Sequence, residues 1–289
     1  MSPQSRAGGL AMRRLRPGGA AVLGYLLLAG VFMFSGCADR LILFPTNSPM
    51  PAPGAQRLVV DSPAGEIEVW RFRGRGEGEP AAYVLAFGGN ADRAESFGFA
   101  EVVQWSGLDV EVWAVNYPGY GGSAGPARLA DIPSAALRVF DRLAATAGRT
   151  PVFVSGTSLG SAAALHVAAQ REVAGVVLCN PVPLRRIILG RFGWWNLWLI
   201  AAPVAASVPA EMEAVRSAGR CRAPTVIFSA QADEVVPAFY HRKVIEACAG
   251  PTRVVAMPGA SHNDLPSSVA GEAAAEAIRW LWEQSRAGR

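Results

Sequence analysis

A turn that contains two glycines constrains this chain more than any other feature. Residues 151–164 read PVFVSGTSLGSAAA, in which an apolar run meets a stretch of small helix-forming residues. The pattern predicts a buried strand, a sharp turn and then a helix. A Cβ at Gly156 or Gly160 would clash in such a turn, and Ser158 would adopt a strained backbone conformation. The turn would lift the Ser158 hydroxyl above the edge of a sheet, beside the free N–H groups of the helix.

Strand-like and helix-like segments alternate through most of the remaining chain. The expected strands cover residues 57–61, 66–72, 82–87, 110–115, 151–155, 173–179, 224–229 and 252–257. The first two alternate apolar and polar residues, which is typical of an antiparallel start, whereas the later ones are continuously apolar. Short strand–helix repeats predict an α/β fold with a mainly parallel sheet.

The net positive charge of the chain comes from its first 36 residues. Residues 1–36 hold Arg6, Arg13, Arg14 and Arg16 among 27 basic side chains and none of the 23 acidic ones, so the rest carries no net formal charge. This distribution argues against a nucleic-acid partner. At 51% hydrophobic and 17% charged residues, the remaining chain can form one large domain over 57–289.

The first 36 residues are typical of an export signal. A basic segment ends at Arg16, an uncharged Leu-rich stretch follows, and Phe34-Ser-Gly precedes Cys37. The pattern resembles a bacterial lipoprotein signal, although that family usually has Leu at the position of Phe34. It would make Cys37 the site of lipidation and tether the domain to the membrane on the periplasmic side. An uncleaved transmembrane anchor and a secreted soluble form are the alternatives. Residues 37–56 are expected to form an extended lead-in.

A segment over 184–212 interrupts the alternation and is rich in tryptophan, including Trp194, Trp195 and Trp198. It could form a buried helix pair that covers the sheet. It could instead form a small apolar cap that binds acyl chains or touches the bilayer.

A reactive serine needs a base, and the chain has three histidines. His166 falls in the helix that follows Ser158 and is expected to pack there. His241 falls in an expected helix over 238–247 and is predicted to be structural or solvated. His262 follows the last strand, at the carboxyl edge where the chemistry of parallel sheets gathers, and is the predicted base.

The imidazole in turn needs an acid that fixes its tautomer. Asp233 follows the strand over 224–229 and leaves the same edge of the sheet. Glu234 and Asp264 are rival carboxylates, the first interpreted as a solvated charge and the second as too close in sequence to His262. The resulting chain order of Ser, Asp and His is that of α/β hydrolases.

Two backbone N–H groups should stabilise a developing oxyanion. One is the N–H of Leu159, the residue after the serine. The other should come from the turn Gly88-Gly89-Asn90, with Asn90 favoured and Gly89 as the alternative.

Five motifs together resemble α/β-hydrolase-domain serine hydrolases, in particular the membrane-anchored, ABHD-type branch. They are FGGNA over 87–91, NYPGYGGS over 116–123, GTSLG over 156–160, DEVVP over 233–237 and SHND over 261–264. The resemblance covers about residues 82–285. It implies an eight-stranded hydrolase sheet with helices on both faces, a Ser158–His262–Asp233 triad, and ester or thioester substrates. It implies no metal and no organic cofactor.

Two positions depart from the pattern of that family. Gly88 stands where the family usually has His, and Pro118 where it often has Arg. The first departure would reshape the loop that carries Asn90, with an effect on catalytic efficiency more than on the class of reaction.

The positions of two cysteines predict a disulfide bond. Cys221 and Cys248 each precede a strand at the amino edge of the sheet, so they could pair as a disulfide in an oxidising compartment. Cys179 ends a buried strand and is expected to be an inert thiol.

These observations favour a monomeric serine hydrolase of carboxylic esters, including acyl lipids, that works through an acyl-enzyme. A thioesterase or a peptidase could use the same triad. A non-catalytic binding protein of this fold is the alternative from a different class.

Overall fold

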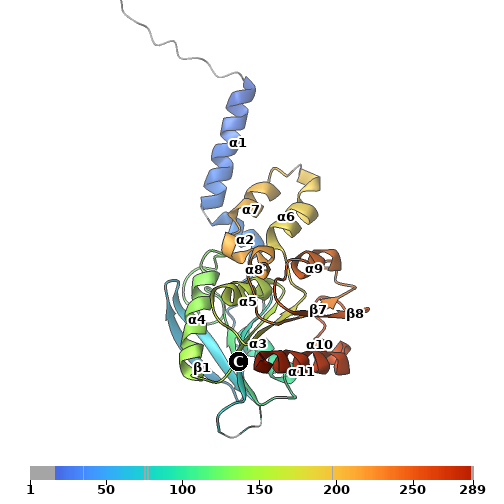
Figure 1. Cartoon of the computed structure of the whole chain (residues 1–289). Coiled ribbons are helices and arrows are strands. Elements are labelled where there is room, and N and C mark those ends of the chain that lie inside the picture. Colours follow the sequence, from blue (N-terminus) through green and yellow to red (C-terminus); the bar gives the residue numbers. More distant parts are fainter. Residues whose placement is uncertain (1–16, 35, 75, 77, 197, 288–289) are drawn as a thin grey trace, which may run out of the picture.

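One eight-stranded sheet forms the centre of the computed structural model, which describes residues 17–34, 36–74, 76, 78–196 and 198–287 (Figure 1). The strand order is β1-β2-β4-β3-β5-β6-β7-β8. The strands are β1 (Gln56–Ser62), β2 (Gly65–Arg73), β3 (Ala82–Phe87), β4 (Val110–Val115), β5 (Val152–Thr157), β6 (Gly175–Cys179), β7 (Thr225–Ala230) and β8 (Thr252–Met257). Strand β2 pairs antiparallel with β1 and β4, and the pairs from β4 to β8 are parallel. The predicted antiparallel start and parallel remainder are thus confirmed.

Helices cover both faces of the sheet, as expected for continuously apolar strands. The helices of the described residues are α1 (Pro17–Phe34), α2 (Cys37–Ile42), α3 (Ala94–Gln104), α4 (Ile132–Ala147), α5 (Leu159–Gln170), α6 (Leu184–Phe192), α7 (Ala201–Ser207), α8 (Ala214–Ala218), α9 (Ala238–Ile245), α10 (Pro266–Val269) and α11 (Gly271–Ala287), with 3-10 turns η1 (Trp194–Asn196) and η2 (Ala210–Met212).

The two faces of each strand enter two separate cores. In β3, Leu85 packs into the core shared with α4 and α5, whereas Val84 packs into the core shared with α3 and α11. This alternation follows from the two-residue period of a strand. Burial on both faces fixes the register of β5, and with it the position of Ser158 at the end of that strand.

The lead-in differs from its prediction at its start. Residues 37–42 form α2 instead of extended chain. Asp39 accepts a hydrogen bond from the N–H of Leu129 through Oδ1 (3.0 Å), and Ala38 and Leu43 are buried against the domain. These contacts stabilise a short helix at the start of the lead-in. The prolines that favour extended chain lie further along it.

The N-terminal helix α1 projects from the rest of the molecule beside α7 (Figure 1). Among the described residues, none of the helices combines the length and the hydropathy of a membrane-spanning segment. The arginines of the expected signal, Arg6, Arg13, Arg14 and Arg16, lie outside the described residues.

The tryptophan-rich segment forms two short helices that pack on each other, α6 and α7. Their inner side chains, including Ile187, Ile188 and Val204, are buried, while Trp194 and Trp195 are exposed. The segment is therefore a helix pair with an apolar outer surface.

Candidate active site

The glycine turn has the strained geometry expected from the sequence. Ser158, between β5 and α5, has φ 51° and ψ −115°. A Cβ at Gly156 would lie 2.3 Å from the carbonyl oxygen of Gly160, and one at Gly160 would lie 2.1 Å from that of Phe87. Only glycine fits at either position, so the two glycines hold Ser158 at the carboxyl edge of the sheet.

We expect Gly160→Ala to destabilise the fold by about 3 kcal/mol or more, because the clashing atoms belong to backbone that cannot move aside. Gly107→Ala is the matched control, since a Cβ there meets nothing within 4 Å. Urea unfolding of both variants checks this. Equal free energies of unfolding for the two would contradict the steric account of the turn.

The structure brings the three predicted side chains together. Nε2 of His262 lies 3.1 Å from Oγ of Ser158, and Nδ1 of His262 lies 2.7 Å from Oδ2 of Asp233. The other oxygen of Asp233, Oδ1, accepts the N–H groups of Val235 (2.9 Å) and Val236 (2.7 Å). The loop after β7 thereby fixes the carboxylate, which in turn orients the imidazole toward the serine.

The environment of Asp233 keeps its carboxyl ionised. Burial alone would raise the pKa of Asp233, but the contact with His241 and the hydrogen bonds from His262 and the N–H of Val236 lower it below its ordinary value. The rival carboxylates are placed elsewhere: Asp264 accepts the N–H of Ser261 at 2.7 Å, and Glu234 is exposed.

Of the backbone donors expected near the serine, two are available. Leu159 is the first residue of α5, where an N–H has no acceptor within the helix. Within the described ranges the N–H of Asn90 has no hydrogen-bond partner. The alternative, Gly89, lies against Ser158 but donates its N–H to Oδ2 of Asp92 at 2.7 Å. Gly89 is therefore already engaged, which leaves Leu159 and Asn90.

The side chain of Asn90 anchors this loop to the lead-in. Oδ1 accepts the hydroxyl of Tyr120 (2.9 Å) and the N–H of Phe44 (3.0 Å), and Nδ2 donates to the carbonyl of Ile42 (2.5 Å). The lead-in that follows α2 thus helps to set the direction of the Asn90 backbone, a role that no sequence motif indicated.

The missing side chain at Gly88 is compensated by its neighbours. A Cβ there would lie 2.5 Å from the ring of Phe97 and 2.9 Å from Cβ of Asp92. Tyr117 donates its hydroxyl to the carbonyl of Gly88 at 2.6 Å. The loop is therefore packed and hydrogen-bonded without the histidine of the resembled family.

Comparison with known proteins agrees with this architecture. Residues 78–201 match the family model described as serine aminopeptidase, S33. An acetyl xylan esterase from Paenibacillus sp. R4 superposes with a TM-score of 0.63 at 17% identity, covering 86% of this chain and 93% of that one. An esterase from Thermogutta terrifontis with propionate bound has a TM-score of 0.58 at 21% identity, covering 82% and 97%. The chain has the α/β-hydrolase fold.

Both of these structural neighbours are described as esterases. A curated relative, an uncharacterised protein of Mycobacterium tuberculosis, is 27% identical over 293 residues, covering 93% of this chain and 96% of the relative. That likeness extends over nearly the whole of both chains.

A second histidine contacts Asp233. His241, in α9, is fully buried, and its Nε2 lies 3.3 Å from Oδ2 of Asp233. Its Nδ1 lies 2.9 Å from Oγ of Ser229, which also accepts Nε2 of Gln231 at 3.1 Å. The Ser229 hydroxyl can therefore donate to Nδ1, which places the proton of His241 on Nε2, facing Asp233. The sequence pattern did not indicate this contact, because it does not show which side chain of α9 reaches the neighbouring loop.

We expect His241→Leu to lower kcat roughly tenfold without raising KM, because Asp233 loses a donor to its charged group. His241→Gln, which retains a donor, should recover part of the rate. In the Asp233→Asn background, His241→Leu should cause no further loss if the two side chains act as a unit. Steady-state kinetics of the four variants check this. Additive losses would contradict a positioning role.

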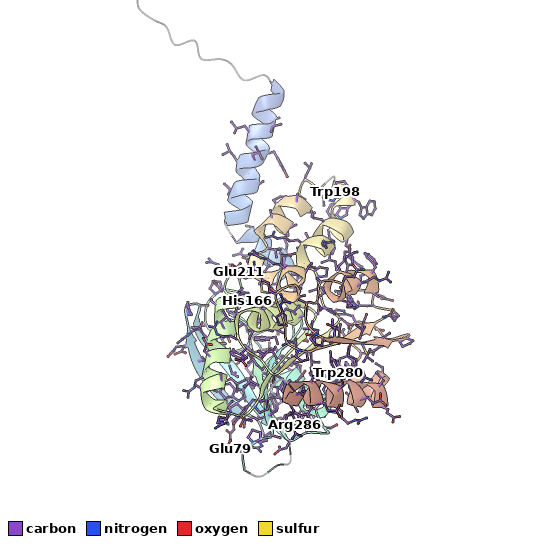
Figure 2. The ribbon with its side chains drawn as sticks, in the orientation of Figure 1. Glu79, His166, Trp198, Glu211, Trp280 and Arg286 are labelled. Atoms are coloured by element: carbon purple, nitrogen blue, oxygen red, sulfur yellow. The ribbon has the colours of Figure 1, made fainter. Side chains whose placement is uncertain are left out.

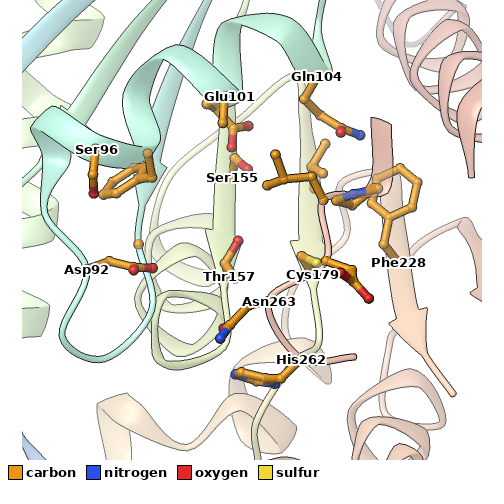
Figure 3. Close-up of a pocket in the computed structure, with 17 residues that line it drawn as sticks. Asp92, Ser96, Glu101, Gln104, Ser155, Thr157, Cys179, Phe228, His262 and Asn263 are labelled. Atoms are coloured by element: carbon orange, nitrogen blue, oxygen red, sulfur yellow. The ribbon is translucent and has the colours of Figure 1, made fainter. Parts of the chain in front are cut away.

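A cavity of about 370 Å³ adjoins His262, between α3 and the sheet (Figure 3). Its polar lining includes Glu101 and Gln104 of α3 and Ser155 and Thr157 of β5. Burial raises the pKa of Glu101, although hydrogen bonds with Ser155 and Trp105 oppose this. Nε2 of Gln104 has no hydrogen-bond partner among the described residues. The cavity can thus accommodate a substrate group that forms hydrogen bonds beside the predicted base.

The predicted disulfide is wrong in this structure. Cys221 and Cys248 are both free thiols. Sγ of Cys248 donates to the carbonyl of Val244 (3.4 Å), and Sγ of Cys221 lies 3.9 Å from the carbonyl of Ala223. Each thiol is directed at backbone next to it in sequence, and burial raises the pKa of both. Proximity at the edge of the sheet was thus not sufficient for pairing.

Proposed function

We propose that this hydrolase cleaves carboxylic esters through a Ser158–His262–Asp233 triad. The observation that carries the proposal is the continuous contact from Oγ of Ser158 through the imidazole to the carboxylate, at 3.1 and 2.7 Å. The distance from Nε2 to Oγ suits proton transfer from the serine hydroxyl, and the distance from Nδ1 to Oδ2 suits a hydrogen bond that orients the imidazole. The esterase neighbours support the same class of reaction.

The proposed reaction has two halves. Oγ of Ser158 attacks the ester carbonyl while Nε2 of His262 takes the hydroxyl proton, and the N–H groups of Leu159 and Asn90 stabilise the oxyanion. Collapse of the tetrahedral intermediate breaks the bond to the alcohol, which receives the proton from His262. A water molecule, deprotonated by His262, then attacks the acyl-enzyme. Collapse of this second tetrahedral intermediate releases the carboxylic acid, and His262 returns the proton to Oγ of Ser158.

The substrate class follows from the surroundings of the triad. The cavity beside His262 presents Glu101, Gln104 and Ser155 to an incoming group, which favours an ester that carries hydrogen-bonding groups on one side. The name of the matching family gives a second candidate, an aminopeptidase, in which the buried carboxyl of Glu101 would lie near a substrate amine.

Hydrolysis of p-nitrophenyl esters of graded acyl length, beside aminoacyl p-nitroanilides, tests the proposal. We expect ester cleavage by the wild type and by Ser134→Ala. The hydroxyl of Ser134 lies in α4 and donates to the carbonyl of Asp131 at the start of the same helix. Cleavage of the anilides with no cleavage of the esters would replace the esterase with the peptidase.

We further propose that the protein is exported and tethered to the cell envelope through Cys37. The uncharged Leu-rich stretch before Cys37 and the arginines before that stretch support this proposal. Feeding cells a palmitate analogue should label the wild type and not Cys37→Ala. Equal labelling of both would remove Cys37 as the acylated residue.

A further inference from the structure

The outer surface of the α6–α7 segment is apolar and aromatic. We call six of its exposed large side chains the aromatic face: Phe192, Trp194, Trp195, Trp198, Leu199 and Ile200. Trp194 and Trp195 are 69% and 61% exposed. Large apolar side chains that cluster in this way on a surface mark a site of interaction.

The aromatic face is continuous with a second apolar surface on α1. Tyr25 of α1 donates its hydroxyl to the carbonyl of Leu199 at 3.1 Å, and α1 and α7 lie side by side (Figure 1). Leu26, Leu27 and Leu28 of α1 are between 58% and 72% exposed. Figure 2 shows Trp198 at the end of the molecule where α1 projects, far from Trp280. Two separate segments of the chain thus present apolar side chains at one end.

The charged side chains of the segment that carries the aromatic face are all arginines. Residues 173–210 contain three arginines and no Asp or Glu. Arg185 is held by the carbonyl of Val208, whereas Arg186 and Arg191 are exposed and form no ion pair among the described residues. Two exposed guanidinium groups beside exposed tryptophans complement a surface that carries negative charge outside and apolar groups beneath, such as an anionic bilayer.

The aromatic face does not serve the substrate cavity. None of its six residues lines the cavity beside His262. Its exposure is therefore not explained by an acyl chain bound at that cavity.

We propose that the aromatic face docks on an anionic lipid bilayer, with Trp194, Trp195 and Trp198 at the level of the headgroups and Arg186 and Arg191 against lipid phosphates. Tryptophan favours the membrane–water interface, and basic side chains are attracted to anionic lipids. The site where the chain would be tethered agrees with this orientation, because α2 begins at Cys37 and contacts α7. Docking of this face depends on neither the reactivity of Ser158 nor the kind of tether.

Quenching of tryptophan fluorescence by brominated acyl chains tests the proposal on the full chain. None of the eight tryptophans of the sequence lies in α1, and three of them belong to the aromatic face. A quencher in the bilayer therefore reports on this face even if α1 itself inserts.

The full chain would be reconstituted into vesicles of phosphatidylcholine and phosphatidylglycerol with brominated chains. We expect marked quenching of the wild type, loss of most of it in W194F/W195F, and no change in W280F, whose tryptophan lies in α11. In R186Q/R191Q the apparent affinity for anionic lipid, measured from the quenching, should fall by about tenfold.

Three results would overturn the proposal of membrane docking, and each can be told from the others. An unquenched wild type would overturn the proposal, as would quenching that W194F/W195F leaves unchanged. An unquenched wild type that sediments as a dimer, with emission shifted to the blue, would assign the aromatic face to a second copy of the chain instead. Ester hydrolysis measured on the same samples shows independently whether the protein is active.

Discussion

Replacing Ser158 with Ala should lower kcat for ester hydrolysis by about 10⁶-fold, because the nucleophile and the group that His262 deprotonates are lost together. The same loss is expected for His262→Ala, and the double variant should be no worse than either single one. Stopped-time assays with a p-nitrophenyl ester, at enzyme concentrations high enough to detect the residual rate, measure this. The non-additivity follows from the contact between Oγ and Nε2 at 3.1 Å.

The matched control is Ser134→Ala, which removes a hydroxyl of the same kind from α4 and should retain full activity. Circular dichroism of all variants establishes that they are folded. A Ser158→Ala protein with more than a few per cent of wild-type activity would show that another residue is the nucleophile.

Replacing Asp233 with Asn should lower kcat by about 10⁴-fold, although the side chains have the same shape. An amide at this position would donate to Nδ1 of His262 and so place the imidazole proton on Nε2, facing Ser158. In that tautomer the imidazole cannot accept the hydroxyl proton. The 2.7 Å contact of Nδ1 with Oδ2 is the one that would be reversed. Full activity in Asp233→Asn would assign the acid to another carboxylate.

The same variant tests how Asp233 contributes to stability. Despite the opposing effect of burial, the contact with His241 and the hydrogen bonds from His262 and the loop lower the pKa of Asp233 in the folded protein. Its ionised form therefore stabilises the fold above the pKa of an unfolded aspartate, about 4, and that contribution is lost as the pH falls toward the lowered folded value. The difference in free energy of unfolding between wild type and Asp233→Asn should be largest near pH 7 and shrink below pH 4. A difference that is constant from pH 7 to pH 3 would contradict the lowered pKa.

The sequence predicted the parts of the site that depend on local pattern. The two glycines around Ser158 are required by the backbone itself, and the apolar strands locate the loops that carry Asp233 and His262. Because the carboxyl ends of parallel strands share one edge of a sheet, chain order was sufficient to bring these three side chains together. The eight strands and their directions follow from the same periodicity.

What the sequence could not predict depends on contacts between elements. The approach of His241 to Asp233 depends on the rotation of α9 against β7, and Gly89 is engaged because Asp92 turns back onto it. The thiols of Cys221 and Cys248 are free, and each is directed at a backbone carbonyl of its own segment. The exposure of Trp194 and Trp195 likewise depends on which side of α6 and α7 faces the domain. Periodicity in such short helices does not determine that side.

Labelling of the folded wild-type protein with a fluorophosphonate probe tests most directly whether Ser158 is an activated nucleophile. The account predicts a single adduct that maps to Ser158 by mass spectrometry, with no labelling of Ser158→Ala and little of His262→Ala. A folded wild type that stays unlabelled, or whose adduct maps to another residue, would contradict the proposed triad.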